Sequence, residues 1–335
     1  MNWPGAKFIR VAANGINFEV ATMGSHPNTP NPGALGTPNS GDRLALCLHG
    51  FPEHAYSWRH QMPLLEKLGY RVWAPNLRGY GGTDSPPEVS AYKTRTLVAD
   101  VAALIQAAQP RETLLLAHDW GGALAWSLAI EQARYAKNAR GDAQPGLIDK
   151  LVVMNMPHPG CFARELRRPP QLFLSWYIYF FQLPWLPELM LRRRNGRATS
   201  GIFRSTSQNR ARFTDDDLEV YRANAMRPGG LTAMVNWYRA AIRAGSLRRL
   251  GTRETPVIHI PTLFLWGDAD TALSFRCTQG TEKYVSNLTF RVFPGISHWI
   301  QQEAPEAVNA MLEAWLTGKR VPEYRELAAV SKLST

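Results

Sequence analysis

Cysteine is scarce in this sequence of 335 residues, and the three that occur, Cys47, Cys161 and Cys277, are widely spaced. An odd number of cysteines without C-x-x-C or Cys/His spacing predicts neither a disulfide framework nor a zinc site. We therefore expect free thiols and a reducing compartment. The amino terminus also lacks the apolar segment of a secretory signal, which favours a cytoplasmic protein.

Long apolar runs are missing as well. The longest apolar stretch, 172–191, is interrupted by Gln182, Pro184, Pro187 and Glu188. Its uninterrupted part is about half of the roughly 18 residues that a membrane span needs, so we expect an aromatic cap over a pocket and no membrane span. No metal-ligand cluster and no phosphate-cradling glycine-rich loop is evident, so the sequence predicts neither a metal nor a cofactor.

Negative charge is in deficit, because 27 acidic residues accompany 38 lysines and arginines and the formal net charge is +11. Contact with nucleic acid or with an anionic membrane is one interpretation of this excess. No nucleic-acid-binding motif accompanies it, so we favour a solvated face of an inserted segment and expect a small-molecule partner and no nucleic acid. Much of the excess comes from Arg192, Arg193, Arg194, Arg197, Arg204, Arg210 and Arg212.

Apolar residues are abundant, and they are arranged in short runs. Hydrophobic residues make up 45% of the chain, which suits one large α/β domain with an inserted subdomain. The first run alternates around Asn14-Gly15, between residues 8 and 20, and predicts a hairpin of two antiparallel strands. The stretch 26–42 is rich in Pro, Gly, Asn, Ser and Thr, and we interpret it as a long exposed loop.

Alternation of apolar runs with helical patterns indicates the fold class. Helical patterns cover 96–108 and 123–136 and lie between runs short enough to be buried parallel strands. This alternation predicts a doubly wound, mostly parallel sheet. The runs are Leu44 to Leu48, Tyr70 to Ala74, Thr113 to Ala117, Ile148 to Met154, Thr262 to Trp266 and Thr289 to Phe293.

The alternation stops between about Pro157 and Gly251. This stretch is aromatic, proline-rich and basic, with helix-like segments around 170–181, 214–225 and 230–244. We expect a helical cap, or lid, inserted after the sixth strand. The predicted domains are a core, formed by 1–156 and 252–335, and a cap subdomain, 157–251.

One short segment indicates the chemistry. Asp119 lies within 117–122, between an apolar run and a helical pattern, where esterases carry the serine of the strand-turn-helix nucleophile elbow. An aspartate that attacked an acyl group would form an anhydride, whereas attack on a saturated carbon forms an alkyl ester that water can cleave. Epoxides and alkyl halides are therefore the leading substrate classes. The alternative interpretation of Asp119 is a helix N-cap.

Four motifs occur together in the chain. They are His49-Gly50-Phe51-Pro52-Glu53, the segment around Asp119, Trp266-Gly267-Asp268-Ala269-Asp270 and Gly295-Ile296-Ser297-His298-Trp299. Their order and spacing resemble those of the α/β-hydrolase superfamily, in particular its soluble epoxide hydrolase branch, over nearly the whole chain after the first strands. The resemblance implies an α/β-hydrolase fold with an inserted helical lid, and an epoxide hydrolase that forms vicinal diols without a cofactor.

The resemblance also implies a catalytic triad. Asp119 is its nucleophile, and His298 removes a proton from the water that hydrolyses the Asp119 ester. His298 needs a carboxylate on its other nitrogen, and Asp270 is favoured over Asp268 by register with the family. Some relatives place this acid after the sixth strand, where the chain has Asn155. We expect Asn155 to anchor a loop by hydrogen bonds from its side chain to the backbone.

The remaining site residues are also implied by the resemblance. The amides of Phe51 and Trp120 form the oxyanion hole for hydrolysis of the ester. Two lid tyrosines donate to the oxygen of the opening epoxide, and Tyr177 and Tyr238 align with them. Tyr179 competes with Tyr177 for the first of these roles, and packing alone is the default for buried tyrosines. We expect further substrate contacts from His49, Pro52, Trp176, Phe181, Trp237 and Trp299.

Two other functions stay open. A haloalkane or haloacid dehalogenase uses the same ester chemistry, but Phe51 replaces the asparagine that often binds the departing halide. Trp120 likewise replaces the arginine expected beside the nucleophile of a haloacetate enzyme. A non-catalytic binding protein of the same fold is less favoured, because every expected catalytic position is present.

Overall fold

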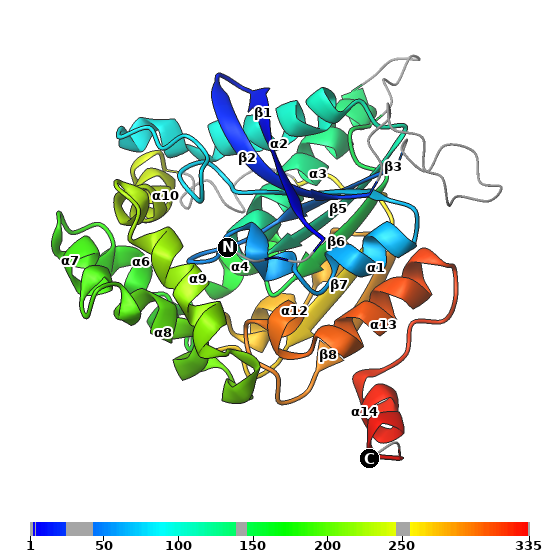
Figure 1. The fold of residues 1–335 in the computed structure, drawn as a ribbon. Coiled ribbons are helices and arrows are strands. Elements are labelled where there is room, and N and C mark those ends of the chain that lie inside the picture. Colours follow the sequence, from blue (N-terminus) through cyan, green and yellow to red (C-terminus); the bar gives the residue numbers. More distant parts are fainter. Residues whose placement is uncertain (1–2, 4, 25–42, 139–145, 246–254, 334–335) are drawn as a thin grey trace.

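The computed structural model describes residues 3, 5–24, 43–138, 146–245 and 255–333, and its centre is one eight-stranded sheet (Figure 1). The strand order is β1-β2-β4-β3-β5-β6-β7-β8. Strand β2 runs opposite to the other seven strands, which all point the same way. The strands are β1 Lys7–Ala13, β2 Ile16–Met23, β3 Arg43–Leu48, β4 Arg71–Pro75, β5 Glu112–His118, β6 Lys150–Met154, β7 Thr262–Gly267 and β8 Leu288–Phe293.

The central strands are apolar along their whole length because both faces of the sheet are covered. In β3, Leu44 and Leu46 belong to one buried cluster, whereas Ala45 and Cys47 belong to the other. Successive side chains of a strand point to opposite faces, so a strand covered on both sides needs apolar residues at every position. Helices α2 and α3 pack into the first cluster, and α1 and α13 into the second.

Thirteen α-helices are described. Those of the sheet layers are α1 Met62–Lys67, α2 Thr94–Ala108, α3 Trp120–Asn138, α12 Ile300–Glu303, α13 Pro305–Leu316 and α14 Tyr324–Leu333. Between β6 and β7 come α4 Pro159–Glu165, α5 Gln171–Leu174, α6 Trp176–Phe180, α7 Leu186–Arg192, α8 Arg197–Thr206, α9 Asp215–Ala225 and α10 Gly230–Arg243.

The hairpin around Asn14-Gly15 and the doubly wound sheet are both confirmed. Strands β1 and β2 pair in antiparallel register, with Ala13 opposite Ile16. The six predicted buried strands agree with β3 to β8 within about two residues at each end, the usual uncertainty of such boundaries. The predicted loop 26–42 lies outside the described residues.

The described residues between β6 and β7 contain helices and no strand, and we call this part the helical segment. Figure 1 shows α6, α7, α8 and α10 on one side of the sheet, at the left of the view. One predicted helix, 170–181, is instead two short helices, α5 and α6, which meet at Ser175.

Sequence patterns missed α4, α7 and α8. Helix α8 contains Gly201, which costs about 1 kcal/mol in a helix, and several residues of weak helix propensity. Its Phe203 is fully buried and stacks on Tyr221, with ring centroids 4.1 Å apart. Burial of such a ring contributes about 1.5–3 kcal/mol. Packing in the tertiary structure therefore outweighs the weak local preference.

The carboxyl ends of the parallel strands bring the predicted motifs together. Residues 49–53 follow β3, Asp119 follows β5, Asn155 follows β6, Asp270 follows β7 and His298 follows β8. In a parallel sheet these ends lie at one edge, where open α/β folds bind ligands. The three cysteines are buried and free, as predicted. No helix in the described ranges is long and apolar enough to cross a membrane.

Candidate active site

Asp119 lies at a sharp turn between β5 and α3. Its backbone has a φ of +48°, in the left-handed region that is unfavourable for residues with a side chain. The turn requires glycine neighbours, because a Cβ on Gly121 would lie 2.3 Å from the carbonyl oxygen of Leu48. A Cβ on Gly50 would lie 2.4 Å from Oδ1 of Asp119. This is the nucleophile-elbow geometry, with a carboxylate at its apex.

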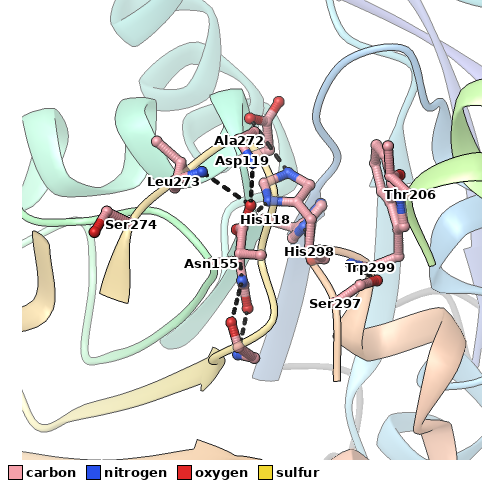
Figure 2. Close-up of polar contacts among 12 residues, drawn as sticks. His118, Asp119, Asn155, Thr206, Ala272, Leu273, Ser274, Ser297, His298 and Trp299 are labelled. Carbon is pink, nitrogen blue, oxygen red and sulfur yellow. Dashed lines mark hydrogen bonds and ion pairs between the residues drawn. The ribbon is translucent and has the colours of Figure 1, made fainter. Parts of the chain in front are cut away.

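His298 lies between two carboxylates. Its Nδ1 is 2.6 Å from Oδ2 of Asp270, and its Nε2 is 3.6 Å from Oδ2 of Asp119. Figure 2 shows the imidazole of His298 facing Asp119, although the two residues follow different strands. Asp119, His298 and Asp270 are thus in contact across three strand ends, in an arrangement that can supply a nucleophile, a base and an acid.

The structure brings Asp270, and not Asp268, to His298. Oδ1 of Asp270 accepts hydrogen bonds from the backbone N–H groups of Ala272 and Leu273, at 2.7 and 2.9 Å, which fixes the carboxylate. Asp268 is exposed, and its Oδ1 accepts a hydrogen bond from the backbone N–H of Gly295. Asp268 therefore holds the loop that leads to His298.

Asn155 has a further contact that the sequence did not indicate. As expected, its side chain binds backbone, because Oδ1 accepts from the N–H of Gly267 and Nδ2 contacts the carbonyl oxygen of the same residue. Nδ2 also donates to Oδ2 of Asp270 at 2.7 Å. Asn155 thus positions the carboxylate that meets His298.

A backbone amide holds the other oxygen of the nucleophile. The N–H of Phe51 donates to Oδ1 of Asp119 at 2.7 Å. Trp120 is the first residue of α3, and the first N–H groups of a helix have no partner within the helix. Both predicted oxyanion-hole residues therefore adjoin the carboxylate.

A largely apolar cavity opens above Asp119. Tyr177 and Tyr238 line it together with Asp119 and Trp120, and the two phenol rings are 5.8 Å apart. Tyr179, the alternative to Tyr177, is 56% exposed and lies outside the lining. The rest of the lining is Thr94, Ala123, Ser127, Met156, Pro157, Pro159, Phe162, Ile178, Ala241 and Leu273.

Both tyrosines are donors at neutral pH. Burial, followed by the negative charge of Asp119, raises the pKa of Tyr177 and that of Tyr238 above the ordinary value of 10. The hydroxyls therefore keep their protons while they face a cavity that contains a carboxylate.

Known proteins resemble this chain over most of its length. A family model described as the alpha/beta hydrolase fold matches residues 46–305. Epoxide hydrolase 4 of Mus musculus is 34% identical over 315 residues, which cover 92% of this chain and 79% of that protein. The chain belongs to the epoxide hydrolase family. It is thus an enzyme of the hydrolase class, and the resemblance found in the sequence is confirmed.

A further relative and a solved structure are also similar to this chain. The AB hydrolase superfamily protein YfhM of Bacillus subtilis is 36% identical over 313 residues, which cover 93% of this chain and 98% of that protein. A crystal structure of an epoxide hydrolase from Bacillus megaterium, in complex with an inhibitor, superposes with a TM-score of 0.77 at 28% identity. It covers 92% of this chain and 100% of the crystallised one.

Six residues that we predicted as substrate contacts lie elsewhere in this member of the epoxide hydrolase family. None of them is among the described residues that line the cavity. Trp176 is 64% exposed, because it precedes Tyr177 on α6 and successive helical residues are rotated by about 100°. Trp237, which precedes Tyr238 on α10, donates from its indole to the carbonyl oxygen of Arg78.

The other four predicted contacts form the packing around the site. Nε2 of His49 accepts from the backbone N–H of Leu77, and Pro52 is buried. The ring of Phe181 lies 4.9 Å from that of Tyr238. Trp299 packs edge-on against His298, and its indole donates to Oγ1 of Thr206 (Figure 2). Phe181 and Trp299 therefore pack against Tyr238 and His298 without lining the cavity.

A second buried ion pair lies beneath the triad, and we had not predicted it. Nδ1 of His118 is 2.8 Å from Oε2 of Glu53, and its Nε2 is 2.9 Å from the carbonyl oxygen of His298. Both ring nitrogens of His118 thus lie within hydrogen-bonding distance of an oxygen atom. Burial raises the pKa of Glu53, but the charge and hydrogen bond of His118 outweigh it and lower that pKa.

Side-chain and backbone amides donate hydrogen bonds to the carboxylate of Glu53. Oε1 accepts from the side chains of Gln301 and Gln302, and Oε2 accepts from the backbone N–H of Gly50. The pair therefore ties the loop after β3 to the segment that carries His298. A signal was available in the sequence, because Glu53 and His118 are charged or titratable residues inside two of the motifs.

The charges of the triad reinforce one another. Burial lowers the pKa of His298, but the charge of Asp270 and the pairing with Asp119 outweigh burial and raise it from 6.5 to about 10. Burial likewise raises the pKa of Asp119, and the hydrogen bond and charge of His298 outweigh burial and lower it. The two carboxylates therefore favour the protonated form of His298.

This arrangement predicts a stability that depends on pH. The pKa of His298 is higher in the folded state, so its protonation stabilises the fold fully below pH 6.5 and the gain is lost as pH rises towards about 10. The stability advantage of the wild type over His298→Gln should therefore shrink between pH 6.5 and pH 10. Urea unfolding of both proteins across this range measures it, and a constant difference would contradict the charged state.

Proposed function

We propose that this protein hydrolyses epoxides to vicinal diols through a covalent ester on Asp119. The single observation that carries the proposal is the carboxylate of Asp119 at the elbow. It faces His298, and it lines the same cavity as two tyrosine donors. A serine at this position would support acyl transfer, whereas a carboxylate supports attack on a saturated carbon. The names of the relatives point to the same substrate class.

In the first step the ester forms. Oδ1 of Asp119 is held by the N–H of Phe51, so Oδ2 is the oxygen that attacks the epoxide carbon. The carbon–oxygen bond of the ring breaks, and its electron pair stays on the epoxide oxygen. Tyr177 and Tyr238 donate hydrogen bonds to this oxygen, and one of the two tyrosines transfers its proton to it, which forms the first hydroxyl of the product. A preorganised donor of this kind contributes about 3 kcal/mol to the transition state.

In the second step water cleaves the ester. Esterification removes the negative charge of Asp119, which is one of the causes that raise the pKa of His298. The imidazolium then gives up its proton, which restores the ionised tyrosine, and the neutral imidazole accepts a proton from the attacking water. Oδ1 carries the negative charge of the tetrahedral intermediate, held by the N–H groups of Phe51 and Trp120. Collapse breaks the bond between Cγ and Oδ2, and Oδ2 leaves in the diol with the proton of the added hydroxyl, so that the carboxylate is regenerated.

The same proposal assigns a role to the helical segment. We interpret 157–251 as a cap that supplies the two tyrosines, and 1–156 with 252–335 as the core that supplies the triad. The cavity lies between residues of both parts, with Tyr177 and Tyr238 on one side and Asp119 on the other. The cytoplasmic location inferred from the sequence stays a prediction that cell fractionation tests.

An activity panel tests the function. The purified protein is incubated in EDTA with styrene oxide, aliphatic epoxides and haloalkanes, and diol and halide are measured together. We expect diol from at least one epoxide class, no halide, and no loss in EDTA, because the triad supplies both nucleophile and base. Halide release without diol would favour the dehalogenase. Absence of both products would favour a non-catalytic binding protein.

A further inference from the structure

Large apolar side chains are exposed on one part of the helical segment. Of the twelve such side chains among the described residues, eight lie between residues 172 and 190. Phe173, Trp176 and Trp185 are 68%, 64% and 69% exposed, and Tyr179 is exposed as well. We call these four aromatics, with the exposed aliphatic residues of 172–190, the apolar face. Clustering of this kind marks an interaction surface, whereas scattered exposed apolar residues are ordinary.

Arginines flank the apolar face at both ends. Arg167 and Arg168 are exposed just before it, and Arg192, Arg193 and Arg194 are exposed just after it. Figure 1 shows α6 and α7, which carry most of this stretch, at the outer edge of the molecule, away from the sheet. The surface is therefore apolar at its centre and cationic at its two ends.

Acidic residues do not balance these arginines. The sequence has two between residues 160 and 200. Glu188 is paired with the buried guanidinium of Arg239, at 2.5 Å. Glu165 is itself buried and lies 2.7 Å from the guanidinium of Arg164 and 3.8 Å from that of Arg168. Two carboxylates thus stand against more than two cations, and the remaining flanking arginines leave a net positive field at the apolar face.

The apolar face lies on the back of the cavity wall. On α6, Tyr177 and Ile178 line the cavity, whereas Trp176 and Tyr179 point to solvent. One helix, about 10 Å across with its side chains, therefore separates the exposed surface from the site. An apolar compound that is held at this surface lies close to the cavity.

We propose that the apolar face inserts into the interface of an anionic phospholipid bilayer and that the flanking arginines bind the lipid phosphates. Tryptophan and tyrosine are the side chains that favour the headgroup level, and clustered arginines favour anionic lipid. Protein segments bind in the plane of a membrane interface by burying apolar side chains in it and by the attraction of their cations to anionic lipids. A second copy of the chain fits less well, because it would bring the two sets of arginines together.

Vesicle binding measured without substrate tests the proposal. The protein is sedimented with phosphatidylcholine vesicles, and with vesicles that also contain phosphatidylglycerol. We expect binding to the anionic vesicles, and weaker binding in high salt because salt screens the arginines. Phe173→Gln with Trp185→Asn should weaken binding at least tenfold. Arg167→Gln, Arg192→Gln and Arg193→Gln should each weaken it about fivefold, and the triple variant that combines them, the arginine set, should weaken it more than any single one.

Matched substitutions elsewhere are the controls. Phe8→Gln with Tyr135→Gln removes two exposed aromatics far from the apolar face in sequence. The triple variant with Lys67→Gln, Lys319→Gln and Arg325→Gln removes the same charge as the arginine set, from exposed positions. Both controls should bind like the wild type. Circular dichroism and urea unfolding establish that every variant is folded.

Three results would overturn the proposal. They are no binding to the anionic vesicles, equal losses in the control and test variants, and a dimer in sedimentation velocity that Trp185→Asn converts to monomer. The last result would assign the surface to a second copy of the chain. Because no epoxide is present, the outcome is independent of whether the protein hydrolyses epoxides.

Discussion

Replacing His298 with glutamine should leave the protein carrying one covalently bound substrate molecule. Asp119 and the two tyrosines stay intact in this variant, so the ester still forms. Glutamine cannot accept a proton from water, so hydrolysis should slow by a factor on the order of a hundred to ten thousand. Intact-protein mass spectrometry after exposure to a good epoxide substrate should then show an increase of one substrate mass.

The matched control for this experiment is Asp119→Ala. This variant should show no added mass and should lose activity by a factor on the order of a million, as when a triad nucleophile is removed. Digestion of the His298→Gln adduct should place the added mass on the peptide that contains Asp119. An unmodified His298→Gln protein that has consumed its substrate would rule out the ester mechanism.

The substitutions Tyr177→Phe and Tyr238→Phe should each slow formation of the ester. Tyr177 and Tyr238 line the cavity above Asp119, and burial keeps both hydroxyls protonated by raising their pKa. Loss of one donor to the developing alkoxide should reduce the alkylation rate by a factor on the order of ten to a thousand. The double variant should be slower than either single one. Rapid quenching followed by mass spectrometry measures alkylation separately from hydrolysis.

Tyr179→Phe is the control for the tyrosine prediction. Tyr179 lies two residues from Tyr177, but it is 56% exposed and outside the cavity lining. Its replacement should leave alkylation unchanged in the absence of membranes. If the double variant at 177 and 238 forms diol at the wild-type rate, the two rings are packing residues and another group must donate to the epoxide oxygen.

Several parts of the fold could be predicted because they depend on local pattern. Strands covered on both faces need apolar residues at every position, as β3 and β5 have, and such runs are visible in a sequence. The hairpin follows from Asn14-Gly15, which adopt positive φ at its turn. Helix α8 could not be predicted this way. The burial of its Phe203 in the tertiary structure stabilises it, whereas the intrinsic helix propensity of its residues is weak.

The structure brings together the predicted site residues that follow strands, whereas several of those predicted on helices point elsewhere. Asp119, Asp270 and His298 follow β5, β7 and β8, and parallel strands bring these ends to one edge. Trp176 and Trp237 were selected because they adjoin tyrosines in sequence. Rotation along α6 and α10 turns both indoles away from the cavity that the tyrosines line.

The sequence by itself therefore determined the sheet, the carboxylate at the elbow and the order of the triad, since each depends on residue types at short spacing. Tertiary structure decided the contact itself: Asp270, which the resemblance favoured, meets His298 and Asp268 does not, because the path of the loop after β7 sets the direction of each carboxylate. It also decided the pairing of Glu53 with His118 and the exposure of the apolar face. Such contacts join side chains from distant elements, and no local pattern records the direction in which a side chain points.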